Sequence, residues 1–86
     1  LYRTNLKNSD LRGANLTGAD LDSNDLSNSN LQGANLTKAY LLGVNLDGAN
    51  LSGANLNGAE YDENTIWPED FDFRNCGALG PNSNLS

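Results

Sequence analysis

The sequence predicts an all-β solenoid, in which the chain winds as a square coil around one narrow apolar core. The first observation is that Leu recurs at every fifth position from Leu6 to Leu56, and that Tyr61 takes the next place. The second is that a small residue, most often Ala, stands two positions before each Leu, with Asn or Asp directly before most of them. The third is that Gly is frequent two positions after the Leu. Short tandem repeats of this kind indicate units that pack against their neighbours.

A period of five residues fits neither regular secondary structure. On an α-helix five residues advance by about 500°, so successive Leu side chains would scatter around the axis. On a flat strand an odd period would place successive Leu residues on opposite faces. If each unit bends the chain by about ninety degrees, every Leu and Ala points to one axis, and Asn, Asp and Gly suit the tight corners that this path requires.

Four units then close one coil, so the twelve units predict about three coils. Residues twenty positions apart should stack, with their backbones bonded at the usual strand spacing of roughly 4.8 Å. The predicted core ladder contains one residue from each unit: Leu6, Leu11, Leu16, Leu21, Leu26, Leu31, Leu36, Leu41, Leu46, Leu51, Leu56 and Tyr61.

The chain divides into a repeat region (1–61), a predicted C-terminal cap (62–75) and a predicted flexible tail (76–86). Ile66 and Phe71 keep the five-residue phase, and Trp67 and Phe73 add two large apolar side chains. Pro68 lacks a backbone donor and should end the pairing. We expect these four apolar residues to cover the last Leu layer, because an uncovered solenoid end associates with other chains. An aromatic binding site is the alternative.

The N-terminal coil has no such cover in the sequence. Leu1 already lies in the repeat phase, so the first coil should expose Leu6, Leu11, Leu16 and Leu21. The absence of Met favours a fragment of a longer protein, and end-to-end association of two copies through this coil is the alternative. No signal peptide is visible in the sequence, which slightly favours a cytoplasmic location, but a fragment would lack its own N-terminal segment, so the location stays unknown.

The units from Thr4 to Tyr61 resemble the pentapeptide-repeat family. The resemblance implies a right-handed quadrilateral β-helix. The segment that contains Asn64, Thr65, Pro68, Phe71 and Asp72 is similar to the tails of many cyanobacterial members. It implies the architecture and says much less about function.

One predicted face differs from the other three. Tyr40 and Leu42 should point outward in its middle coil, with acidic residues above and below. Apolar side chains grouped on a polar surface are typical of contact sites, although single exposed apolar residues are also common. The predicted protein-binding residues are Tyr40, Leu42, Asp20, Asp22, Glu60 and Asp62.

Composition argues against most other functions. The chain has no His and one Cys, so a nucleophile would lack its usual base and a His/Cys zinc site would lack ligands. We therefore predict no enzyme activity, cofactor or metal. The net charge of −6 argues against nucleic-acid binding, and the chain has no apolar run of about 18 residues that could cross a membrane.

The leading hypothesis is a non-catalytic module that binds an unidentified protein. The family resemblance offers a second, a DNA mimic that binds a type II topoisomerase such as gyrase. However, residues 1–61 carry a net charge of only −2, from four basic and six acidic residues. A third is recognition of an ordered lattice such as ice by the face that carries Asn15, Thr17, Asn35, Thr37, Asn55 and Asn57.

Overall fold

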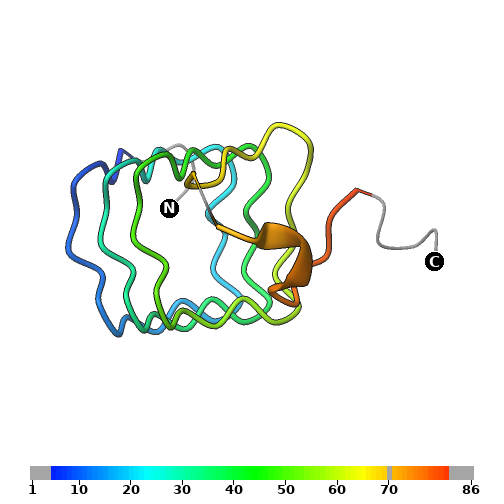
Figure 1. The fold of residues 1–86 in the computed structure, drawn as a ribbon, viewed down its shortest axis with the longest axis horizontal. Coiled ribbons are helices and arrows are strands. Elements are labelled where there is room, and N and C mark those ends of the chain that lie inside the picture. Colours follow the sequence, from blue (N-terminus) through cyan, green and yellow to red (C-terminus); the bar gives the residue numbers. More distant parts are fainter. Residues whose placement is uncertain (1–4, 70, 82–86) are drawn as a thin grey trace.

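The computed structural model describes residues 5–69 and 71–81, which form stacked coils closed by a C-terminal cap (Figure 1). The successive coils lie side by side along the long axis of the molecule, and the cap lies at one end. The regular element of the described residues is a short 3-10 helix, η1 (Phe73–Asn75), within the cap. The coils themselves are joined by isolated parallel bridges rather than by long strands.

Within the repeat region the bridges connect residues twenty positions apart, as the sequence predicts, whereas the two bridges to the cap join Asn45 to Ile66 and Glu60 to Leu79. From Asn5 to Asn55 each bridged residue stands directly before a ladder Leu. In the middle coil its own N–H and carbonyl bond to the preceding coil, and the residues on either side of it bond to the next coil. On the second side, for example, Leu11 N–H donates to the Asn30 carbonyl at 2.8 Å, and Leu31 N–H donates to the Asn50 carbonyl at 2.8 Å. The four columns are Asn5–Asp25–Asn45, Asp10–Asn30–Asn50, Asn15–Asn35–Asn55 and Asp20–Tyr40–Glu60.

The corners of the coil are tight turns with a left-handed residue. In each unit the N–H of the small residue donates to the carbonyl of the Leu three positions earlier, as from Ala34 to Leu31 at 2.9 Å. The residue two positions after the Leu has a positive φ, which together with this bond is the pattern of a type II turn. Gly occupies most of these positions, and the others hold Asn8, Ser23, Asn28 and Lys38.

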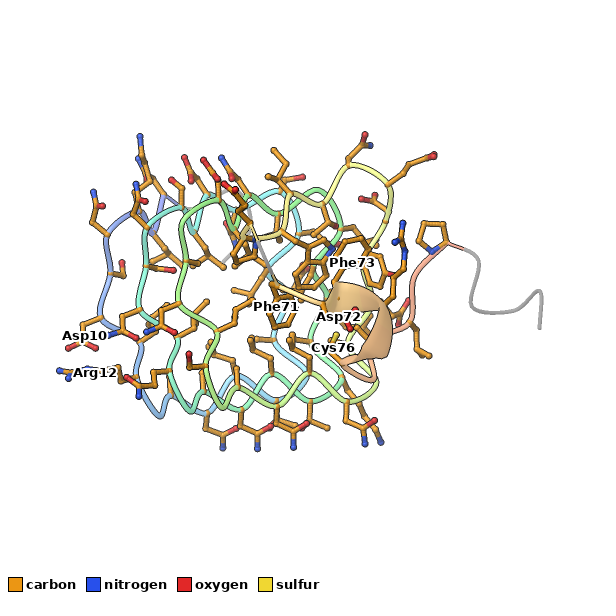
Figure 2. All side chains as sticks on the ribbon, viewed as in Figure 1. Asp10, Arg12, Phe71, Asp72, Phe73 and Cys76 are labelled. Atoms are coloured by element: carbon orange, nitrogen blue, oxygen red, sulfur yellow. The ribbon has the colours of Figure 1, made fainter. Side chains whose placement is uncertain are left out.

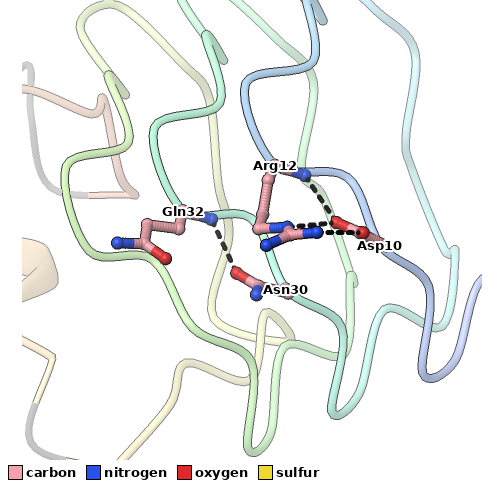
Figure 3. Close-up of polar contacts among 4 residues, drawn as sticks. All are labelled: Asp10, Arg12, Asn30 and Gln32. Atoms are coloured by element: carbon pink, nitrogen blue, oxygen red, sulfur yellow. Dashed lines mark hydrogen bonds and ion pairs between the residues drawn. The ribbon is translucent and has the colours of Figure 1, made fainter.

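A side-chain hydrogen bond closes most of these turns on their outer side. The Asn or Asp before the Leu accepts from the N–H two positions later, as between Asn30 Oδ1 and Gln32 N–H at 3.1 Å (Figure 3). Such Asx bonds explain why Asn and Asp dominate this position. The bond recurs in ten units, from Asn5 to Asn55, and is missing in the units of Tyr40 and Glu60.

The core is the predicted Leu ladder. Every ladder Leu from Leu21 to Leu56 is buried, with Ala34, Ala39 and Ala59 packed beside it. Leu6, Leu11 and Leu16 are half-buried at the N-terminal end. The expectation that Leu21 is exposed is wrong, because it is 1% exposed. The coil rises continuously, so Leu21 lies three sides further from the N-terminal edge than Leu6.

The cap continues the coil with a shift of one residue. Thr65 N–H donates to the Asp62 carbonyl at 3.1 Å, so this turn spans 62–65. Ile66 therefore pairs with Asn45 at an outward position and is 51% exposed. The prediction that Ile66 covers the Leu layer is wrong. Trp67 takes the inward place beside Leu46 and packs against the core.

Aromatic rings close the C-terminal end. Trp67 stacks on Phe71 and on Phe73, with ring centroids 5.4 Å and 5.5 Å apart. Tyr61 meets the rings of Trp67 and Phe73 edge to face, at 5.3 Å and 5.7 Å. Figure 2 shows Phe71 and Phe73 at the cap end of the coils. Trp67 and Phe71 contact the core itself, whereas Phe73 packs on the other rings.

The tail prediction is wrong for residues 77–79, which pair with the last coil. Gly58 N–H donates to the Gly77 carbonyl at 2.9 Å, and Leu79 forms a parallel bridge with Glu60. The composition of this segment is rich in Gly, Pro, Asn and Ser, but its backbone supplies hydrogen-bond partners for Gly58, Ala59 and Tyr61 of the last coil. Residues 82–86 of the predicted tail lie outside the described residues.

Candidate protein-binding surface

The fourth side of the coil carries a column of outward side chains of mixed polarity. Parallel bridges place Asp20, Tyr40, Glu60 and Leu79 in that order along the axis. Tyr40 is 42% exposed and Leu79 is 50% exposed, while Asp20 and Glu60 are exposed carboxylates. The structure thus brings three of the predicted binding residues into one row, with two apolar side chains separated by a carboxylate.

The corner next to this column holds the other three predicted residues, and all three are half-buried. The Asp22 carboxylate accepts from Leu42 N–H at 2.9 Å. The Asp62 carboxylate accepts from Gly43 N–H at 3.0 Å and from Asn64 N–H at 2.9 Å. These two carboxylates hold backbone groups, so they contribute less to an outer surface than expected. Leu42 is not as exposed as the sequence predicts.

Two further apolar residues, Leu79 and Ile66, are exposed on or beside this side, where the sequence pattern does not place them. Leu79 reaches the fourth side because the chain after the cap pairs with the last coil. The five-residue repeat does not extend to this segment, so the sequence pattern does not predict the pairing. Ile66 lies on the adjacent first side because of the one-residue shift in the turn at 62–65. Tyr40, Ile66 and Leu79 are the exposed large apolar residues of the described part of the chain.

The side chains with shifted pKa values lie on other sides of the coil. Asp10 and Arg12 form an exposed ion pair, with Arg12 Nη2 and Asp10 Oδ2 2.7 Å apart (Figure 3). The hydrogen bond from Arg12 lowers the pKa of Asp10, and the same bond raises the pKa of Arg12. Hydrogen bonds from the Ser27 hydroxyl and N–H lower the pKa of Asp25. These shifts accompany local turns, and none lies in a cleft.

A hollow of about 430 Å³ lies beside the cap, where the alternative prediction places an aromatic binding site. Tyr61, Trp67 and Phe73 line it, together with Asp62, Glu63 and Arg74 among others. The rings pack mainly against one another, and the Arg74 guanidinium lies 5.2 Å from the centroid of the Phe73 ring. The chain's own cation therefore occupies a ring face that a cationic ligand would need.

The described residues contain no group of three or more His, Cys, Asp or Glu that could hold a metal ion. The Cys76 thiol is half-buried and donates to the Phe73 carbonyl at 3.1 Å. In the same part of the chain no helix has the length and apolar character needed to cross a membrane.

Comparisons with known proteins agree with this geometry. The family model described as pentapeptide repeats matches residues 1–37 and 25–60, in eight copies. The crystal structure of Rfr23, a pentapeptide repeat protein from the cyanobacterium Cyanothece 51142, is similar, with 51% identity and a TM-score of 0.77. That match covers 78% of this chain and 46% of Rfr23, so the chain spans about half the length of this relative. A search of curated proteins found no match.

Two further structures show the same architecture. The pentapeptide repeat protein alr5209 from Nostoc Pcc 7120 is 35% identical, with a TM-score of 0.59, and the match covers 88% of this chain and 75% of that one. AT2G44920, a pentapeptide repeat protein from the Arabidopsis thaliana thylakoid lumen, is 26% identical, with a TM-score of 0.65 and coverages of 88% and 61%. The fold is the right-handed quadrilateral β-helix that the sequence predicts, and members of the family are generally non-catalytic. Its five-residue units, its four-sided coils and these matches show that the chain belongs to the pentapeptide-repeat family.

Proposed function

We propose that the chain is a non-catalytic protein-interaction module, and that it binds its partner through the fourth side of the coil. The observation that carries this proposal is the exposure of Tyr40 in the middle coil, in line with Leu79. Tyr is favoured in protein contacts because it combines a large apolar area with a polar tip at low entropic cost.

The scaffold supports such a role through its rigidity. Tyr40 N–H donates to the Ala19 carbonyl at 2.9 Å, and the Tyr40 carbonyl accepts from Leu21 N–H at 2.9 Å. Leu79 is fixed in the same way, through N–H and carbonyl bonds to Ala59 and Tyr61. A partner therefore meets side chains whose backbone is already ordered, so less conformational entropy is lost on binding.

The carboxylates in the column define the chemistry of the partner. Asp20 and Glu60 flank Tyr40 along the axis, and both are exposed. A partner with an apolar pocket for Tyr40 and basic residues on either side would match this arrangement, because complementary charges at the rim raise the association rate and select orientation.

The other functions find less support in this geometry. A DNA mimic needs a long acidic surface, whereas the molecule extends over 36 × 24 × 24 Å and its repeat region carries a net charge of only −2. An ice-like lattice needs outward hydroxyls, whereas the Thr17 hydroxyl donates to Asn15 Oδ1 at 2.8 Å and the Thr37 hydroxyl donates to Asn35 in the same way.

Affinity purification from the source cells, compared between the wild type and Tyr40→Ala, tests the proposal. Gln32→Ala is the matched control, because Gln32 is an exposed residue of the same coil on another side. A partner that is lost with Tyr40→Ala and retained with Gln32→Ala supports the proposed surface. Equal recovery of every partner with both variants refutes it. Leu79→Ala should weaken the same partner, because Leu79 lies in the same row.

A further inference from the structure

The backbone along the C-terminal edge of the last coil is hydrogen-bonded to the cap at Leu46 and at Gly58, but the described residues form no such bond between these two positions. At one end Leu46 N–H donates to the Ile66 carbonyl at 2.7 Å, and at the other Gly58 N–H donates to the Gly77 carbonyl at 2.9 Å. From residue 48 to residue 56 the described residues of the cap form no backbone hydrogen bond with the coil. The cap takes a shorter path here, through Pro68 and η1, than a full coil would.

The lower coils show which partners this edge lacks. Leu31 and Gly33 N–H donate to the Asn50 and Ser52 carbonyls, both at 2.8 Å. Asn50 N–H in turn donates to the Ser29 carbonyl at 3.0 Å. One coil later, Leu51 N–H and Gly53 N–H have no acceptor among the described residues, and the Ala49 carbonyl has no donor among them. The edge therefore presents one acceptor followed by two donors, at alternate residues, as one side of a parallel pair does.

A hollow of about 480 Å³ lies beside this open edge. Residues 49–54 form one wall, and cap residues Pro68, Glu69, Phe71 and Cys76 form the other. Pro68 and Glu69 follow Ile66 closely, so they lie toward the Ala49 end of the edge. Cys76 directly precedes Gly77, so it lies toward the Ala54 end, and Figure 2 shows it with Phe71 at the cap end of the molecule.

We propose that this edge is a binding site for an extended peptide segment of a partner protein, which adds as a parallel strand along residues 49–54. Strand addition to an exposed edge is a common mode of peptide recognition, in which backbone bonds give affinity and side-chain pockets give specificity. The proposal is independent of the Tyr40 surface, because residues 49–54 lie on the second side of the coil and Tyr40 lies on the fourth.

The chain's own coils define the sequence that fits. The segments stacked at this position in the lower coils read Ser-Asp-Leu-Arg at 9–12 and Ser-Asn-Leu-Gln at 29–32. The partner segment should therefore carry Leu, or a residue of similar size, between two polar residues, with the Leu directed toward Leu51 and Phe71. The exposed Glu69 carboxylate at the Ala49 end favours a basic residue on the N-terminal side of the segment.

Titration of the isotope-labelled chain with a synthetic peptide tests the proposal. The peptide is acetyl-Lys-Ser-Asn-Leu-Gln-Gly-Ala-amide, which copies residues 28–34 with Asn28→Lys. Binding should shift the amide resonances of Leu51 and Gly53 and slow their hydrogen exchange at least tenfold, because both N–H groups gain acceptors. Absence of shifts up to millimolar peptide overturns the proposal, and so do shifts confined to Tyr40 and Leu79.

Two controls separate strand addition from apolar association. A peptide N-methylated at its Asn loses the donor for the Ala49 carbonyl and should bind about tenfold more weakly. Equal affinity of the two peptides overturns the strand geometry. In the protein, Glu69→Lys should weaken binding severalfold, whereas Glu63→Lys, an exposed carboxylate at the other hollow with the same charge change, should not. Equal effects of the two variants overturn the predicted orientation.

Discussion

The Asp22 carboxylate lies 2.9 Å from the backbone N–H of Leu42, twenty residues later in the chain. In ten units this N–H is held by the Asn or Asp two positions earlier. Tyr40 stands at that position here and offers no acceptor in reach. A carboxylate from the preceding coil therefore replaces the local one, and this replacement allows an exposed aromatic residue in the middle of the repeat.

Removal of the Asp22 side chain should destabilise the fold more than removal of an ordinary Asx acceptor. Asp22→Ala leaves the half-buried Leu42 N–H without a partner, at a cost of about 1–3 kcal/mol in the free energy of unfolding. In the Tyr40→Asn background, the new Asn should accept from Leu42 N–H, so Asp22→Ala should cost about 1 kcal/mol less. Urea unfolding of the two single variants and the double variant measures this coupling, and strict additivity would contradict the replacement.

The Leu ladder should dominate the stability of the coil. Leu36 is 1% exposed in the middle coil, so Leu36→Ala should lower the free energy of unfolding by about 2–5 kcal/mol. Thr37→Ala changes the next residue, whose hydroxyl bonds to Asn35 on the outer side, and should cost less than about 1 kcal/mol. Comparison of the urea midpoints gives the ranking, and similar losses in both variants would show that the ladder is not the main source of stability.

The fold is predictable from the sequence because a single periodicity serves both the core and the backbone pairing. Three features depart from that periodicity, and the sequence does not predict them. The first is the shift of one residue in the turn at 62–65. Thr65 N–H bonds to the Asp62 carbonyl, whereas the repeat phase would bond Asn64 N–H to the Tyr61 carbonyl. Ile66 therefore points outward, and Trp67 takes the inward place. Leu79 joins the fourth side through a return of the cap that has no repeat pattern. The bond from Leu42 to Asp22 spans twenty residues, which local turn rules do not describe.

The left-handed corner positions should distinguish backbone strain from steric overlap. A Cβ at Gly33 would have no atom within 4 Å, but its φ is +70°, so Gly33→Ala should destabilise by about 1–2 kcal/mol through strain alone. Gly48 has a φ of +73°, and a Cβ there would also overlap the Asn28 side chain, so Gly48→Ala should cost more. Combining Gly48→Ala with Asn28→Gly should recover the difference. Equal costs for the two single variants would mean that the Asn28 side chain moves aside freely.

Acid should destabilise the protein as the carboxylates with lowered pKa values become protonated. Asp25 and Asp10 have folded-state pKa values below the ordinary value of 3.8. A lowered folded pKa stabilises the fold above the unfolded pKa, and this contribution is lost as the pH falls through the folded pKa. Stability against urea should therefore be constant above about pH 5 and fall progressively below pH 4. A constant midpoint down to pH 2.5 would contradict this dependence.

The causes of the two shifts should be separable by salt. The pKa of Asp25 is lowered mainly by hydrogen bonds from Ser27, which is 8% exposed, so Ser27→Ala should raise it. The pKa of Asp10 is lowered mainly by the hydrogen bond from Arg12, and both side chains of this ion pair are 61% exposed.

High salt weakens exposed ion pairs more than hydrogen bonds between a carboxylate and a neutral group. In an NMR titration at 1 M salt, the pKa of Asp10 should therefore rise more than that of Asp25. An equal rise of both pKa values would assign the Asp25 shift to Lys7, the nearby charge, instead of Ser27.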